Sequence, residues 1–240
     1  MTELQEKMLE KKPGMMLQKT TGARKNTVRV LTGMLMAALL IAGAERATAQ
    51  GKNKIGPAAP VTYDNRYEIY GGINLMNFQA GQDLPTRMNM GGGEVSMTYW
   101  LTNHVGLTAD YRGEAGTTPV HPNAFEINRP LVYMNMGMLG AQYRGPKNHY
   151  AAINYHAYFG ASHGVFDSST GNVPPQYLPT IGLYTNRTKG IAALGGSVDF
   201  NYSKNIAIRL APDLMLEHFG TETRQFFAIS GGVVYRFGKR

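Results

Sequence analysis

The sequence predicts an all-β protein, an eight-stranded antiparallel up-and-down transmembrane β-barrel. Three observations lead to this prediction. Eight segments alternate apolar and polar residues, and their lengths are close to the roughly 9 to 11 residues that a tilted strand needs to cross a bilayer. The connections between these segments alternate between short and long. A segment typical of exported proteins precedes all eight.

Residues 1–49 are predicted to be a signal peptide with an extended N-terminus. Three basic residues precede the apolar stretch 30–44, and Ala47 and Ala49 then form an A-x-A cleavage signature before Gln50. A membrane anchor is the alternative, but this stretch is shorter than the roughly 20 residues of a spanning helix and has small residues beside it. We therefore expect the mature chain to begin at Gln50.

Composition suggests the remaining boundaries. Residues 50–65, rich in Gly, Pro and Ala, are predicted to be a periplasmic linker, and residues 66–240 are predicted to be the barrel. A polar stretch ahead of a signal peptide is unusual, so translation from Met15 or Met16 is an alternative start.

The charge of the chain gives little indication of nucleic-acid binding. The formal net charge is +8, but residues 1–49 hold eight Lys/Arg and four Asp/Glu, which leaves +4 on the rest. No basic run there is broader than residues 238–240, whereas phosphate binding needs clustered basic side chains. The chain has no cysteine, which excludes disulfides, thiolate metal sites and cysteine nucleophiles. We expect no nucleic-acid partner and no cofactor.

The predicted strands are joined by connections of two kinds. The strands are 67–78, 91–101, 105–113, 131–144, 150–161, 191–202, 206–216 and 224–237. The short connections are 102–104, 145–149 and 203–205, and the long ones are 79–90, 114–130, 162–190 and 217–223. This order puts both ends of the barrel chain on the short-turn side, as in membrane barrels with short periplasmic turns and long extracellular loops.

Opposite charges predict the register around two of the short turns. Tight pairing across the first puts Glu94 opposite Arg112, and tight pairing across the last puts Asp199 opposite Arg209. Such pairs stabilise an exposed sheet by roughly 0.2 to 1 kcal/mol, and pairing matters more in an enclosed lumen. We interpret both pairs as part of a polar-filled barrel interior. The alternative is the solvated face of a water-soluble sheet whose apolar face points inward.

Three further residues are predicted to face the lumen. Strand alternation puts Asp110 on the same face as Arg112, and it puts Asn154 and His156 on one face with Tyr158. We interpret His156 as a lumen residue with satisfied hydrogen bonds rather than as a catalyst.

Segment 131–144 fits the alternation badly. Placing Arg144 inward turns three methionines inward as well and leaves Asn135 outward. A bulge near Gly137 would relieve this conflict, because glycine within a strand often marks a bulge. The methionines are interpreted as packing residues rather than a metal-binding array, because the segment has no nearby histidine.

Four segments carry a resemblance to a known family. They are 91–111 (GGGEVSMTYWLTNHVGLTADY), 194–200 (LGGSVDF), 208–213 (IRLAPD) and 230–238 (SGGVVYRFG). Over nearly all of 67–238 the chain resembles the small bacterial outer-membrane β-barrel proteins of the OmpA-like and OmpX-like type. The resemblance implies that Tyr235 and Phe237 belong to a C-terminal signal read by the barrel-assembly machinery. Here three more residues follow Phe237, whereas the family's signal ends on Phe.

The resemblance also implies a location in the bacterial outer membrane and contact with its lipid. Side chains fill an eight-stranded barrel, so bulk transport is not expected. The expected function is non-enzymatic, either structural or surface interaction, and an extracellular ligand would bind through loops 114–130 and 162–190.

One alternative is an outer-membrane enzyme acting on lipid or peptide, with loop histidines as candidates: His121, His163 beside Ser162, and His218 beside Glu217. The other is a narrow ion pore.

Overall fold

The computed structural model describes residues 61–81, 84, 86–171, 173–219 and 222–239. Its eight strands are β1 (Asn65–Phe78), β2 (Met88–Trp100), β3 (Val105–Thr117), β4 (Leu131–Lys147), β5 (Ala151–Val165), β6 (Arg187–Asn201), β7 (Ile206–Glu217) and β8 (Arg224–Lys239). A short 3-10 helix, η2 (Pro175–Ile181), lies in the longest connection. No helix within the described ranges is long and apolar enough to cross a membrane.

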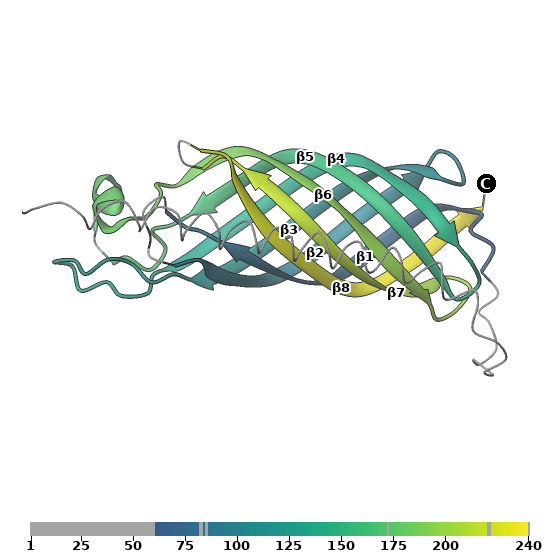
Figure 1. Cartoon of the computed structure of the whole chain (residues 1–240), viewed down its shortest axis with the longest axis horizontal. Helices are drawn as coiled ribbons and strands as arrows, with labels where there is room; N and C mark the ends of the chain where they lie inside the picture. The colour runs from purple at the N-terminus through teal and green to yellow at the C-terminus, as the bar shows by residue number, and fades with distance from the viewer. Residues whose placement is uncertain (1–60, 82–83, 85, 172, 220–221, 240) are drawn as a thin grey trace, which may run out of the picture. The chain divides into compact units, whose positions relative to one another are not determined.

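The strands close into one barrel. Each strand pairs antiparallel with its neighbours in sequence, and β8 pairs with β1. The predicted eight-stranded up-and-down architecture is therefore confirmed. Figure 1 shows the strands inclined to the barrel axis, with η2 at one end and the C-terminus at the other. The predicted signal peptide and most of the predicted linker lie outside the described residues.

One polar side chain organises each of the three short turns. Thr102 Oγ1 accepts hydrogen bonds from the backbone of His104 and Val105. Asn148 Oδ1 accepts two in the second turn, and Ser203 Oγ accepts one from Ile206 in the third. Side-chain oxygens of Thr, Asn and Ser mimic a backbone turn in this way, so these residues define the tight end of the barrel.

The strands extend further toward the long connections than the sequence predicts. β2 begins at Met88 instead of residue 91, and β3 continues to Thr117 instead of ending at 113. β5 and β6 likewise extend to Val165 and back to Arg187. The loops predicted at 114–130 and 162–190 are accordingly shorter, because residues 114–117 belong to β3, residues 162–165 to β5 and residues 187–190 to β6.

The sequence left the register of this segment open, and the bulge considered near Gly137 is not formed. β4 keeps one register with β3 and β5 through Gly137, and the irregularity in its pairing lies between Arg144 and Lys147 instead. Asn135 does point outward, where the Tyr111 hydroxyl donates to its Oδ1 at 2.8 Å. A hydrogen bond to a neighbouring strand thus accommodates the polar side chain without a change of register.

Candidate functional site

The lower layer of the interior, at the short-turn end, is an ion-pair cluster of Glu68, Arg144, Asp199, Arg209 and Arg236. Glu68 Oε2 accepts from Arg144 Nη2 at 2.9 Å and lies 3.4 Å from Arg236 Nε, while Glu68 Oε1 accepts from Arg209. Asp199 accepts from Arg209 Nε at 2.7 Å and from Arg236 Nη2 at 2.8 Å. All five side chains are buried, so the cluster joins five strands across the lumen.

Aromatic rings cover this layer. The Cζ atom of Arg144 lies 3.8 Å from the centre of the Trp100 ring and 5.2 Å from that of Tyr63. The Tyr63 hydroxyl donates to the carbonyl of Asn148 at 2.8 Å, and burial raises the pKa of this phenol, which keeps it protonated. Val61 and Tyr63, within the predicted linker, therefore pack against the short-turn mouth of the barrel.

The middle layer of the interior surrounds Arg112. Its guanidinium lies 2.7 Å from Asp213 Oδ2, 2.9 Å from Asp110 Oδ1 and 3.5 Å from Glu94 Oε1. His156 Nε2 lies 2.6 Å from the other oxygen of Asp213. Arg112 has no exposed surface, so these carboxyl groups replace the water that would otherwise solvate it.

The upper layer, toward the long connections, is mainly apolar. Its buried side chains include Met76, Met90, Met134, Met136, Ile191, Met215 and Phe226. Glu114, Glu217 and Ser162 are buried on its strands as well. The predicted polar-filled lumen therefore applies to the lower and middle layers only. Toward the long connections, the inward positions of β1, β2 and β4 are mainly methionine.

The interior contains more acidic than basic groups. The buried residues in the described ranges include seven carboxyl groups and four guanidinium groups. The lower layer has two of the carboxyls and three of the guanidiniums. The middle and upper layers together therefore hold five carboxyls and one guanidinium, with His156 as the only other basic group named there. This difference concerns the fully buried groups, because Arg187, Lys189 and Arg224 lie at inward positions of β6 and β8 near the long connections and are partly exposed.

The predicted site residues divide between the two polar layers and the barrel wall. Glu94 lies opposite Arg112, and Asp199 lies opposite Arg209, the two register pairs that the sequence predicted. Asp110, Asn154 and His156 face inward; Asn154 donates to Ser197 at 3.1 Å, and the ring of His156 stacks on Tyr158 at 4.5 Å. Tyr235 and Phe237 lie on the outer wall, where their rings stack at 5.7 Å.

Sequence reasoning missed Glu68, Arg236 and Asp213 as interior site residues, and it placed Glu114 and Glu217 in loops. The structure corrects both points, since each of these side chains is buried and lies on a strand. Strand alternation alone could have indicated Arg236, which lies between the outward Tyr235 and Phe237.

The loop histidines do not assemble the pairs that the enzyme alternative considered. Ser162 is fully buried, whereas His163 is exposed on the outer face, where its Nδ1 lies 2.8 Å from Thr188 Oγ1. His218 is exposed and Glu217 is buried, and His218 interacts with Thr223 instead. In the described residues, no three His, Cys, Asp or Glu side chains are grouped to hold a metal ion.

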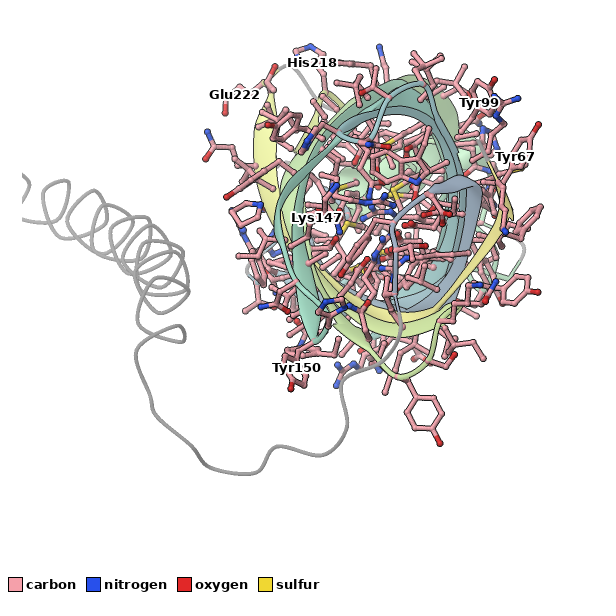
Figure 2. The ribbon with its side chains drawn as sticks, turned by 90° about the vertical axis from the view of Figure 1, so that its right-hand side faces the viewer. Tyr67, Tyr99, Lys147, Tyr150, His218 and Glu222 are labelled. Atoms are coloured by element: carbon pink, nitrogen blue, oxygen red, sulfur yellow. The ribbon has the colours of Figure 1, made fainter. Side chains whose placement is uncertain are left out.

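The outer surface of the barrel is apolar on every strand. Exposed side chains, one from each strand in order, are Ile73, Val95, Leu107, Leu139, Phe159, Phe200, Ile208 and Val233. Near the short turns this surface is aromatic: the ring of Tyr67 lies 5.4 Å from those of both Tyr99 and Phe237. Figure 2, which views the barrel from the short-turn end, shows Tyr67 and Tyr99 pointing away from the filled interior.

The two longest connections meet at the far end of the barrel. Residues 118–130 form a hairpin-like loop with backbone hydrogen bonds from Thr118 to Pro130 and from Val120 to Asn128. Its exposed Phe125 lies 6.1 Å, between ring centres, from the exposed Tyr177 of η2. A depression of about 350 Å³ lies between residues 125–130 and 169–171. These loops present aromatic and polar groups together.

Comparisons with protein-family models and with curated proteins gave no match. Among solved structures, the chain is similar to Ail, the attachment invasion locus protein of Yersinia pestis (17% identity, 72% of this chain and 99% of that chain, TM-score 0.47). It is also similar to Neisserial surface protein A (11%, 71% and 97%, TM-score 0.48) and to the N-terminal β-barrel domain of Pseudomonas aeruginosa OprF (15%, 72% and 98%, TM-score 0.43). The strand pairing of this chain establishes its architecture independently of these similarities.

Proposed function

We propose that this chain is an integral protein of the bacterial outer membrane, with a non-enzymatic structural or surface-interaction role. The observation that carries the proposal is the distribution of polarity across the barrel wall. Apolar side chains are exposed on all eight strands, while eleven charged side chains are buried inside. In a water-soluble barrel the apolar face would point inward, so the bilayer is the environment that suits this surface.

The aromatic side chains near the short turns support the same proposal. Tyrosine and related rings collect at the interface between the hydrocarbon and the head groups, where the ring is in apolar surroundings and the hydroxyl reaches water. Tyr67, Tyr99 and Tyr235 occupy this level on neighbouring strands. The short turns would then face the periplasm and the long connections the outside.

In this proposal the barrel is a scaffold and the long connections form the interaction surface. Phe125 and Tyr177 are exposed on two different connections and lie close together, which makes an aromatic patch held by a rigid support. A partner outside the cell would bind here. Biogenesis through the barrel-assembly machinery, using Tyr235 and Phe237, belongs to the same proposal.

Gel mobility and cell fractionation test the proposal directly. Outer membranes would be prepared from cells expressing the full chain, and boiled and unboiled samples compared on a denaturing gel. We expect the protein in the outer-membrane fraction, a faster band before boiling, and a mature N-terminus at Gln50. A soluble periplasmic protein without a mobility shift would contradict the proposal.

Electrical recording tests the ion-pore alternative. The lower and middle layers fill the lumen with paired charges, so we expect no stepwise conductance after repeated insertion into planar bilayers. Reproducible steps that change size on substitution of Arg112 would favour the pore.

A further inference from the structure

We propose that residues 61–64 form a strap that closes the short-turn mouth of the barrel and can open while the strands stay paired, with the Tyr63 side chain as its latch. The strap lies directly ahead of β1, and in Figure 2 the segment that leads into β1 crosses the mouth in front of the filled interior. Such a strap requires the barrel fold but not the membrane location.

Tyr63 contacts the barrel on several sides of the mouth. Its hydroxyl donates to the carbonyl of Asn148 at 2.8 Å and accepts from Asn201 Nδ2 at 2.6 Å. The centre of its ring lies 5.2 Å from the Cζ atoms of both Arg144 and Arg236. These partners belong to the second short turn, β6, β4 and β8, so one side chain connects separate parts of the rim.

The strap shields the lower layer from water. Val61 and Tyr63 form one apolar cluster with Ala152 of β5. The Arg144 guanidinium lies against the rings of both Tyr63 and Trp100, and Arg144 and Trp100 have at most 1% of their surface exposed. Both side chains lie near an open end of the barrel, where water would reach them if no segment covered the mouth. The strap therefore accounts for their burial.

The backbone of Tyr63 is strained. Its φ angle is 56°, a left-handed conformation that is uncommon for residues other than glycine and unfavourable for a bulky side chain. Such conformations persist only where the surrounding structure holds them. The contacts of the ring and the hydroxyl supply this hold, so loss of those contacts would release the strain together with the strap.

Side chains, and not strand pairing, attach the strap to the barrel. Within the ranges that the structure describes, no hydrogen bond between backbone groups joins residues 61–64 to a strand, and pairing begins at Asn65, opposite Lys239. Segments without such bonds open at a lower free energy than the paired strands beside them. The mouth can thus open while all eight strands remain paired.

An open mouth would admit anions more readily than cations. The lower layer contains three buried guanidinium groups and two buried carboxyl groups, and Lys147 Nζ lies 5.4 Å from the centre of the Tyr63 ring. A recess lined by an excess of positive charge raises the local concentration of anions. An anion that enters past the strap should therefore reach Trp100, whereas a cation is repelled.

Fluorescence quenching tests the proposal, because Trp100 is the only tryptophan of the chain. The full mature chain, folded in detergent and checked by its heat-modifiable band, would be titrated with iodide. We expect weak quenching in the parent and a Stern–Volmer constant at least about fivefold higher in Tyr63→Ala, since losing two hydrogen bonds shifts an equilibrium by about this factor or more. Caesium should show a smaller rise.

The matched control is Tyr150→Ala. Tyr150 lies at the same end of the barrel, but its side chain is exposed, and Figure 2 shows it outside the ring of strands. This variant loses a tyrosine from the rim without releasing the strap, so its Trp100 should be quenched as weakly as that of the parent.

A second measurement uses the parent chain alone and decides the question even if Tyr63→Ala does not fold. In increasing urea, Trp100 should become accessible to iodide while the protein still runs as the folded band, because the strap opens before the barrel unfolds. The proposal is overturned if iodide quenches the folded parent and folded Tyr63→Ala equally, or if Tyr150→Ala raises quenching as much as Tyr63→Ala. It is also overturned if Trp100 becomes accessible only as the folded band is lost.

Discussion

Arg144 lies against the Trp100 ring at 3.8 Å and at the same time donates to Glu68 at 2.9 Å. These three residues come from β4, β2 and β1, so one guanidinium connects three strands across the short-turn mouth. Glu68 is in turn the acceptor for Arg209 and Arg236. A single carboxyl group is therefore shared by three buried guanidinium groups.

Glu68→Gln should destabilise the barrel strongly. The variant leaves Arg144, Arg209 and Arg236 with Asp199 as the one remaining carboxyl group of the layer. Removing one partner of a buried ion pair costs about 3 to 5 kcal/mol, so the midpoint of unfolding in urea should fall clearly. The exposed Glu222 is a matched control, because Glu222→Gln removes the same charge from a loop and should change stability by less than about 0.5 kcal/mol. Equal midpoints for the two variants would show that the cluster contributes little.

Gly160→Ala should prevent close pairing of β4 with β5. A Cβ at Gly160 would lie 1.9 Å from the backbone carbonyl oxygen of Gly137, whereas a Cβ at Gly137 would have nothing within 4 Å. Backbone cannot move aside as a side chain can, so Gly160→Ala should lower the yield of heat-modifiable, folded barrel. Gly137→Ala should fold like the parent. The prediction is contradicted if both variants refold equally well.

The sequence predicted the local features of the fold well. Alternation and turn residues located all eight strands, and the charge pairs gave the registers of Glu94 with Arg112 and of Asp199 with Arg209. These features depend on residues within one hairpin, so they can be read from a short stretch of sequence. The function proposed for the loops is not tested by any of them.

The sequence did not reveal contacts that depend on closing the barrel. Glu68 meets Arg144 and Arg236 only because β8 returns to β1 and because strand inclination brings distant positions to one level. Glu114 and Glu217 were placed in loops because turn-forming residues lie close to them in the sequence. These residues obscure the alternation of inward and outward side chains at the ends of β3 and β7. Local periodicity contains no information about which walls face each other.

Leu139→Arg should destabilise the barrel if lipid surrounds it. Leu139 is 68% exposed and lies midway along the outer wall of β4, beside the exposed Phe159. An arginine on the lipid face near the bilayer centre costs about 2 to 4 kcal/mol, and near the interface about 0 to 1 kcal/mol. Tyr202→Arg, at the short-turn end, is therefore the control. Urea unfolding in lipid vesicles should separate the two variants, and a Leu139→Arg protein as stable as the control would contradict a bilayer around the wall.

Asn123→Ala should loosen the loop of residues 118–130 without affecting the barrel. The Asn123 Oδ1 atom accepts from the backbone of Phe125 at 3.1 Å and of Ile127 at 3.2 Å, and its Nδ2 donates to the carbonyls of His121 and Ile127. Losing bonds worth about 1 kcal/mol each should speed chymotrypsin cleavage after Phe125 about fivefold or more. Asn128→Ala, in the same loop, should be cleaved like the parent. Because cleavage on intact cells requires this loop to face outward, resistance of both variants on cells, with cleavage of the purified proteins, would place the loop on the periplasmic side.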